Sequence, residues 1–195
     1  MSNTDRNYVT IVSGLPRSGT SMMMKMLDAG GIAALTDNVR TADEDNPKGY
    51  FEFEAVKKTK KDPAWLERAG GMVVKMVHLL LLDLPLDREY RVIFMRRKLE
   101  EVVKSQNVML ERNGKDTGAL ADEQVMRVFR AQMDKVDLYA KENARHLKML
   151  DVNYNDLLAD PRPAIQAVNE FLDGTLNTQA MATVVDPSLY RQRSA

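Results

Sequence analysis

The chain has 195 residues, 44% of them hydrophobic and 29% charged, and its 28 Lys and Arg residues balance its 28 Asp and Glu residues. Because it has no cysteine and only two histidines, disulfides, thiolate catalysis, Cys-ligated zinc and three-His metal sites are excluded. The balanced charge gives no support for a nucleic-acid partner, the longest apolar run (residues 77–82) is too short to span a bilayer and the N-terminus lacks a signal-peptide pattern, so we expect one cytoplasmic domain over residues 1–195.

The first expected strand, Tyr8–Ser13, leads into a glycine-rich loop that is close to the Walker A pattern of nucleotide-binding proteins. Gly14 and Gly19 are five residues apart, but Thr20 stands where the pattern requires lysine. An expected helix, Ser21–Ala29, follows the loop. A loop of this kind aims backbone N–H groups into one concavity, where the positive end of the helix dipole favours an anion.

The residues of this loop predict an anion site that works without a metal ion. Arg17 lies inside the loop, and the hydroxyls of Thr20 and Ser21 can donate hydrogen bonds to an anion. A magnesium-dependent triphosphate site would need the missing lysine and an acidic residue at a second strand tip, and the expected strand ends "VVKM" and "VIFMRR" carry none. The residues expected to bind the anion are Pro16, Arg17, Ser18, Gly19, Thr20 and Ser21.

The rest of the chain alternates between expected strands and helices. Three further apolar runs predict buried strands, namely Met72–Met76, Tyr90–Met95 and Leu147–Val152. Helical patterns cover Glu100–Arg112, Ala121–Asn143 and Pro163–Leu172. The apolar stripe of the long middle helix also includes Gln132. This alternation predicts an α/β fold of three layers and P-loop type, with a central, mostly parallel sheet flanked by helices.

A second basic element follows the third expected strand. Arg96 and Arg97 lie at its carboxyl end, and Ser105 comes eight residues after Arg97, two turns into the next helix. Ligands of parallel sheets bind at this edge. Because arginine binds phosphate with two parallel hydrogen bonds and a serine hydroxyl can satisfy a remaining oxygen, Arg97 and Ser105 predict a second phosphate site near the first.

Together, "LPRSGTS" and the Arg97–Ser105 pair resemble the sulfotransferases that use 3′-phosphoadenosine 5′-phosphosulfate (PAPS) and release adenosine 3′,5′-bisphosphate (PAP). The resemblance implies that the first loop holds the 5′-phosphosulfate, that Arg97 and Ser105 hold the 3′-phosphate, and that Tyr154 lies by the adenine. Further similar stretches are "NPKGYFE" (46–52), "VVKMVHLLLLDLP" (73–85), "VNYNDLLADP" (152–161) and "DPSLYRQR" (186–193). The second element departs from the family's R-D-P or R-N-P, because it reads Arg97-Lys98-Leu99.

The resemblance implies transfer of a sulfonate group to a small-molecule acceptor, in line and without metal. We expect Arg17 to stabilise the leaving phosphate. His78 is the first candidate for the general base because it follows the second strand near the ligand edge, and Lys75 would assist the leaving oxygen. Asp37 is a competing base, with Glu52 as a further carboxylate in the same region.

Two alternatives stay open at this point. One is a nucleotide or metabolite kinase with a degenerate Walker A loop, which would bind ATP with Mg²⁺. The other is a non-catalytic relative that keeps the nucleotide site. The sequence leaves the acceptor and the oligomeric state undetermined.

Overall fold

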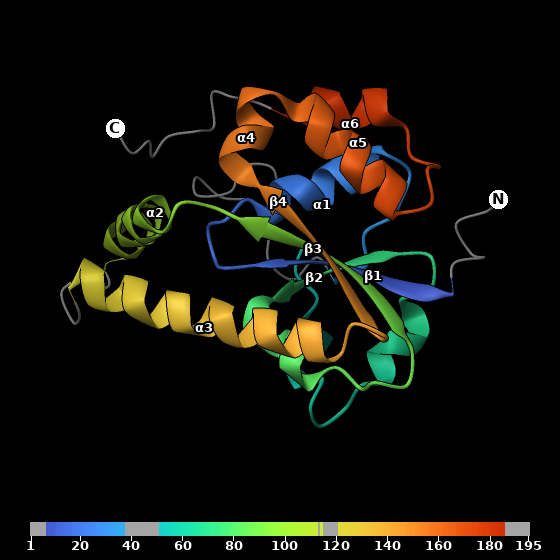
Figure 1. Ribbon diagram of the computed structural model, residues 1–195, viewed down its shortest axis with the longest axis horizontal. Coiled ribbons are helices and arrows are strands. Elements are labelled where there is room, and N and C mark those ends of the chain that lie inside the picture. The colour runs from blue at the N-terminus through green and yellow to red at the C-terminus, as the bar shows by residue number, and fades with distance from the viewer. Residues whose placement is uncertain (1–6, 38–50, 113, 115–120, 186–195) are drawn as a thin grey trace.

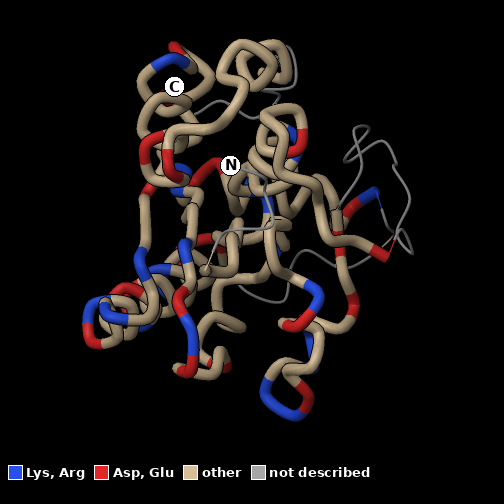
Figure 2. The backbone as a smooth tube through the Cα atoms, turned by 90° about the vertical axis from the view of Figure 1, so that its right-hand side faces the viewer, with Lys and Arg blue, Asp and Glu red and all other residues tan. Residues whose placement is uncertain are grey.

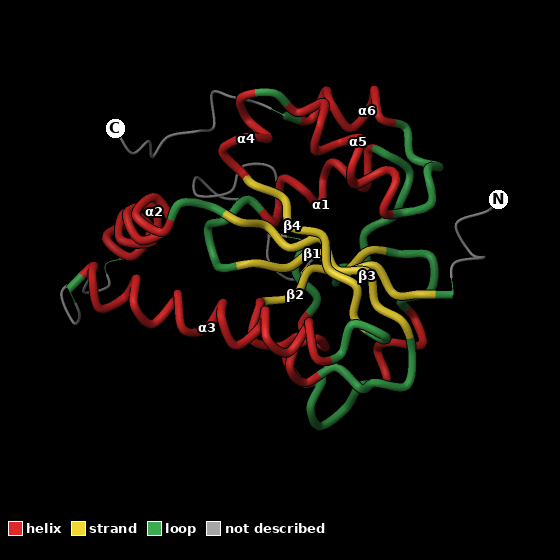
Figure 3. Tube along the Cα trace, in the orientation of Figure 1, coloured by secondary structure: helices red, strands yellow, loops and turns green. Residues whose placement is uncertain are grey.

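A computed structural model describes residues 7–37, 51–112, 114 and 121–185 of the chain. A sheet of four parallel strands forms the centre, with helices on both faces (Figures 1 and 3). The strands are β1 (Tyr8–Gly14), β2 (Val73–Val77), β3 (Glu89–Arg96) and β4 (Leu147–Asn153). Each begins and ends within one residue of the expected strand, which confirms the α/β prediction. Within the described ranges, no helix has the length and apolar character needed to cross a membrane.

The order of the strands in the sheet is β2-β1-β3-β4, so β1 lies between β2 and β3. All seven residues of β1 are buried, as expected of a strand whose two faces are both covered. The register aligns the carboxyl ends: Gly14 lies opposite both Val77 and Met95, and Arg96 lies opposite Asn153. The loops that follow all four strands therefore leave the sheet at the same edge.

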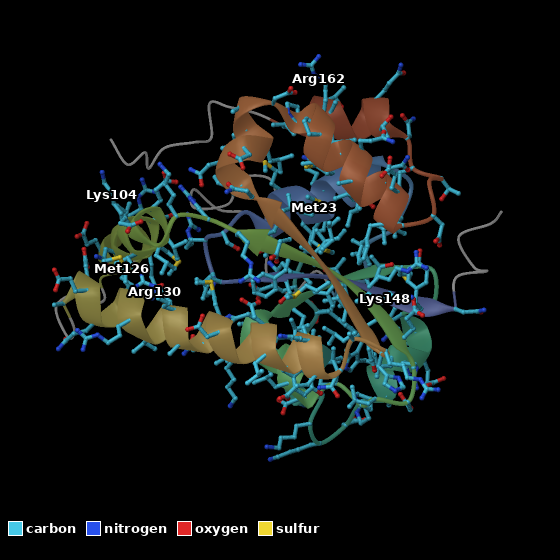
Figure 4. The ribbon with its side chains drawn as sticks, in the orientation of Figure 1. Met23, Lys104, Met126, Arg130, Lys148 and Arg162 are labelled. Atoms are coloured by element: carbon cyan, nitrogen blue, oxygen red, sulfur yellow. The ribbon has the colours of Figure 1, made fainter. Side chains whose placement is uncertain are left out.

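One face of the sheet is covered by α1 (Thr20–Ala29), α4 (Tyr154–Ala159), α5 (Pro161–Phe171) and α6 (Thr178–Val184) (Figure 1). The fully buried Met23 lies where α1 meets this layer (Figure 4). The side chains of Asn153, Asp160 and Asn177 accept backbone N–H groups at the starts of α4, α5 and α6. Such caps fix the point at which a short helix begins.

The opposite face is covered by three 3₁₀ helices and the long helix α3 (Asp122–Glu142). The 3₁₀ helices are η2 (Glu54–Lys58), η3 (Ala64–Arg68) and η4 (His78–Asp83). Helix α2 (Leu99–Arg112) packs beside the N-terminal part of α3, and Met126 lies between the two helices (Figure 4). Leu15, from the first loop, belongs to this same apolar cluster. The first loop is thereby packed against the α2–α3 pair.

The outer edge of β2 is also covered. Ala34 forms an isolated parallel bridge with Val73, and Leu35 N–H donates to the Val73 carbonyl at 2.8 Å. Beyond it, the Thr36 hydroxyl donates to the Glu52 carbonyl at 2.8 Å. Charges of both signs lie next to one another along the described chain (Figure 2), in keeping with the zero net charge of the sequence.

Candidate functional site

The loop between β1 and α1 contains three residues with positive φ angles. Gly14 and Gly19 adopt φ angles of 149° and 96°, and Arg17 adopts 69°. A Cβ atom on Gly14 would lie 2.6 Å from Ser18 Oγ and 2.7 Å from the Met95 carbonyl oxygen, so only glycine fits there. A positive φ is unfavourable for arginine by roughly 1 kcal/mol or more. Such strain commonly occurs at a functional loop.

Arg17 joins the loop to the second basic element. Its Nε donates to Ser105 Oγ at 3.0 Å, across 88 residues of sequence. The Arg97 Nη1 atom in turn donates to the Arg17 carbonyl at 2.9 Å. The structure therefore brings together three residues that the sequence predicted to bind the two ends of one ligand. The two guanidinium groups give this part of the site a local positive charge.

A buried carboxylate positions Arg97. Arg97 Nε donates to Glu101 Oε2 at 3.0 Å, and the two side chains are 7% and 1% exposed. Asn155 Nδ2 lies 3.1 Å from each carboxylate oxygen of Glu101. Because Glu101 is satisfied on both oxygens, the Arg97 side chain is held in one orientation. The sequence prediction missed Glu101, although an acid four residues after Arg97, in the first turn of the helix that follows it, was a signal for this pair.

Tyr154 closes the same cluster from the start of α4. The guanidinium carbon of Arg97 lies 4.6 Å from the centroid of its ring, which is a cation–π distance. A Cβ atom on Gly19 would lie 2.3 Å from Tyr154 Cδ2, so the ring packs directly against the loop. Burial raises the pKa of Tyr154, whose phenol is neutral at physiological pH. Tyr154 is thus in contact with both predicted binding elements.

The remaining loop residues lie at the start of α1. Gly19 is the N-cap and Thr20 the first helical residue, so the N–H groups of this first turn have no partner within the helix. Ser21 Oγ accepts from Lys75 Nζ at 3.4 Å, which places Lys75 beside the loop, as expected. Pro16 is exposed, and Ser18 is buried with no hydrogen-bond partner for its Oγ among the described residues.

His78 lies directly after β2, beside the first loop residue, and is 3% exposed. Its Nε2 lies 2.9 Å from Gln132 Oε1 on α3. Burial lowers the pKa of His78 and outweighs the opposing hydrogen bond to Gln132, so the ring is neutral at physiological pH. A general base needs this neutral state. Gln132 was predicted only as part of a packing stripe, and its polarity within that stripe was the available signal.

Asp37 lies beside η2. Its Oδ2 accepts the Glu54 N–H at 2.6 Å, and its own N–H donates to the Glu52 carbonyl at 3.3 Å. The Lys57 pKa is raised chiefly by its hydrogen bond to Glu54, with Glu52 and Asp37 contributing. These contacts give Asp37 a structural role as a cap of η2. Its predicted role as a base stays a prediction, and the stretches 38–50 and 186–193 lie outside the described residues.

Arg96 is directed away from this cluster. It pairs with Asp151 on β4 at 2.9 Å and with Asp137 on α3, and its guanidinium carbon lies 4.2 Å from the Phe94 ring centroid. Arg96 therefore ties α3 to the sheet. Its neighbour Arg97 instead donates to the backbone of the first loop. That Arg97 rather than Arg96 binds the ligand stays a prediction.

The residues present fit the two phosphate groups of the implied donor. A buried Ser18 hydroxyl without a partner among the described residues, a left-handed glycine turn and two arginines lie within one contact network. An unsatisfied buried hydroxyl is unfavourable unless a ligand or water completes it. The loop suits the 5′ group, and Arg97 with Ser105 suits the 3′-phosphate.

No protein-family model and no curated protein sequence matches the chain. Among solved structures, it is similar to the sulfotransferase domain of the Synechococcus PCC 7002 olefin synthase, with a TM-score of 0.58 and 14% identity over 100% of this chain and 92% of that one. The sulfotransferase domain from the curacin biosynthetic pathway gives 0.51 and 14% over 95% and 89%. Sulfotransferase STF1 from Mycobacterium tuberculosis H37Rv gives 0.57 and 15% over 93% and 72%. The chain therefore has the fold of the sulfotransferase domains.

Proposed function

We propose that this chain is a sulfotransferase that moves a sulfonate group from PAPS to a hydroxyl or amine of a small-molecule acceptor. The observation that carries the proposal is the junction of Arg17, Ser105 and Arg97 by hydrogen bonds of 3.0 and 2.9 Å. These hydrogen bonds connect the β1–α1 loop, which would bind one phosphate group, to Arg97 and Ser105, which would bind a second. The donor supplies an activated sulfonate and leaves as PAP.

The chain's own residues have separate tasks at the donor. The backbone N–H groups of the loop and the hydroxyls of Thr20 and Ser21 bind the 5′ group. Arg17 offsets the negative charge that grows on the leaving phosphate, and Lys75 supports the same oxygen from β2. Arg97 and Ser105 hold the 3′-phosphate, while Tyr154 lies against the nucleoside.

The donor would occupy the carboxyl ends of β1, β3 and β4, so we assign the acceptor's binding site to the carboxyl end of β2. Val77 ends this strand and is 48% exposed, and Val128 on α3, 47% exposed, lies one turn before Gln132. Val77 directly precedes His78 in the chain, and Val128 lies four residues before Gln132 on α3; His78 and Gln132 are the two residues joined by the 2.9 Å contact. Exposed aliphatic side chains beside a candidate base support an acceptor whose reacting group is attached to an apolar part.

His78 is the first choice for the base that takes the acceptor's proton, because its ring is neutral and lies beside the loop. Asp37 and Glu52 are the alternatives, and the hydrogen bond from Glu54 N–H to Asp37 ties that carboxylate to η2. A comparison of His78→Ala with Asp37→Ala in single-turnover reactions separates the two. Loss of turnover in the Asp37 variant alone would move the base role to the carboxylate.

The proposal is tested by incubating the protein with PAPS carrying radioactive sulfur and a panel of alcohols, phenols and amines. We expect transfer to at least one acceptor class, with the same rate in EDTA as in magnesium. Bound PAP without transfer to any acceptor would instead support the non-catalytic alternative, which the burial of His78 favours. Transfer that requires magnesium would contradict the proposed chemistry.

A further inference from the structure

The contact between His78 and Gln132 joins two regions that are 54 residues apart in sequence. His78 Nε2 faces Gln132 Oε1 at 2.9 Å. The other ring nitrogen, Nδ1, is buried and has no hydrogen-bond partner among the described residues. The two nitrogens of one imidazole thus have different surroundings: Nε2 has a side-chain acceptor in hydrogen-bond geometry, whereas Nδ1 has none in the described part of the chain, although the Gly14 backbone is close enough to the ring to oppose the lowering of its pKa.

This asymmetry determines where the ring proton lies. The oxygen of a glutamine side chain only accepts hydrogen bonds, so the nitrogen that faces it carries the hydrogen. A neutral imidazole has a single N–H group, and Nδ1 therefore keeps its lone pair. The hydrogen bond made by one ring nitrogen selects the chemistry that is available at the other.

The position of the imidazole ring suggests a role for the unprotonated Nδ1 atom of His78. Val77 lies opposite Gly14 in the sheet, so His78 leaves the sheet beside the first residue of the loop. Leaving a buried acceptor without a donor is unfavourable, and structures that retain one commonly reserve it for a ligand, a water or a catalytic step. An acceptor hydroxyl bound at the end of β2 would supply the missing donor.

We propose that Gln132 is a positioning residue that holds the proton of His78 on Nε2 and so leaves Nδ1 as the basic atom of the site. The catalytic consequence depends on the proposed sulfotransferase function, whereas the tautomer itself does not. Gln132 acts through His78 and needs no contact with donor or acceptor.

Within the ranges that the structure describes, no charged side chain near His78 competes with the Gln132 amide in determining which ring nitrogen carries the proton. Charged residues on the elements that pack around His78 include Lys75 on β2, Asp83 on η4 and Lys135 on α3. The lowered pKa of His78 is caused by burial and opposed first by Gln132 and then by the Gly14 backbone, with no charged side chain of the described residues contributing. The Gly14 backbone is therefore the one rival to Gln132 for the ring proton in this part of the structure.

The tautomer can be measured directly, because the chain has only His78 and His146. Nitrogen NMR of the full chain labelled at histidine distinguishes a protonated from an unprotonated ring nitrogen, and the His146→Gln variant assigns the signals of His78. We expect a single Nε2–H tautomer at neutral pH. A single Nδ1–H tautomer would overturn the proposal, because the ring proton would then face the Gly14 backbone and the amide would present its nitrogen to the ring.

Three variants complete the test. Gln132→Leu should yield a mixture of tautomers and lower kcat at least about tenfold, with PAP affinity changed less than about twofold. Gln132→Glu keeps an acceptor, so it should keep the Nε2–H tautomer and move the pH profile of kcat upward. Lys135→Leu, a substitution at an exposed position of the same helix, should leave the tautomer of His78 and the pH profile of kcat unchanged. Retention of the wild-type tautomer and pH profile in Gln132→Leu would overturn the proposal, and the NMR result stands even if no acceptor is turned over.

Discussion

The two sides of the candidate site are built differently. The proposed donor side, at the ends of β1, β3 and β4, is a network of charged and backbone groups in which Arg97 contacts both the Arg17 carbonyl and Glu101, and Arg17 contacts Ser105. The proposed acceptor side, at the end of β2, has a buried neutral histidine and the exposed Val77, with the exposed Val128 on α3 one turn from Gln132. In the proposed function, the donor side is thus preorganised for a ligand with fixed charges, whereas the acceptor side relies on shape and one proton-accepting atom.

The largest effect should come from the cation that is nearest to the leaving group. Arg17→Ala is expected to lower turnover by about 100- to 1000-fold, because it removes charge stabilisation from the transition state. The matched control is Arg130→Ala, at an exposed residue of α3 (labelled in Figure 4), which should keep the wild-type rate. Turnover is measured at saturating donor, with melting temperatures recorded for both variants. Equal rates in the two variants would remove Arg17 from the catalytic role.

The 3′-phosphate should distinguish the two basic elements. Arg97→Lys keeps a charge beside the buried Glu101 but loses the planar geometry that holds it. We expect this variant to reduce the preference for PAP over adenosine 5′-monophosphate by about 10- to 100-fold, since a hydrogen bond to a charged group contributes about 1.5–3 kcal/mol. Calorimetric titration with both nucleotides measures the preference. An unchanged preference would mean that the 3′-phosphate binds elsewhere.

These two predictions concern residues that could be identified from the sequence. The loop is recognisable because its glycines and arginine lie within a few consecutive residues, and the four strands because each is a continuous apolar run. Helices α4 and α6 were missed, since six and seven residues are too few to develop a helical period. Their capping residues, Asn153 and Asn177, were the remaining signal.

The acceptor side could not be predicted in the same way, because tertiary packing creates it. Gln132 meets His78 only when α3 packs across η4, and no local pattern encodes that contact. Asp37, in the segment after α1, accepts a hydrogen bond from Glu54 N–H. The partner of Asp37 depends on how its loop packs against the segment that contains Glu54, and the spacing of residues along the chain does not determine that packing.

A smaller effect tests the packing of the donor side. Gly19→Ala brings a Cβ atom to 2.3 Å from Tyr154, whereas Gly31, with a similar φ of 104°, has nothing within 4 Å. Both alanine variants share the backbone strain of a positive φ, so their difference isolates the contact with Tyr154. We expect Gly19→Ala to lower the free energy of unfolding by about 1–3 kcal/mol more than Gly31→Ala. Urea denaturation that gives equal losses would show that the ring moves aside easily.

The smallest effect concerns the acceptor side and pH. The unfolded chain binds a proton at His78 with a pKa of about 6.5, and burial lowers this pKa in the folded state. Stability from His78 is therefore complete above about pH 6.5 and falls as the pH drops below it, by at most about 1.4 kcal/mol per pH unit. The difference in unfolding free energy between wild type and His78→Asn, measured at pH 7.5 and 5.5 (about one unit either side of that value), should shrink at the lower pH. A constant difference would contradict a buried neutral ring.

The central claim is that the donor side binds a doubly phosphorylated adenylate without a divalent ion. Its most direct test is the melting temperature of the protein with PAP in EDTA and with ATP and Mg²⁺, since a ligand that binds the native state raises it by mass action. We predict a rise with PAP that Arg97→Lys reduces, and no rise with ATP and Mg²⁺. A rise with magnesium and ATP alone would contradict the account and favour the kinase alternative.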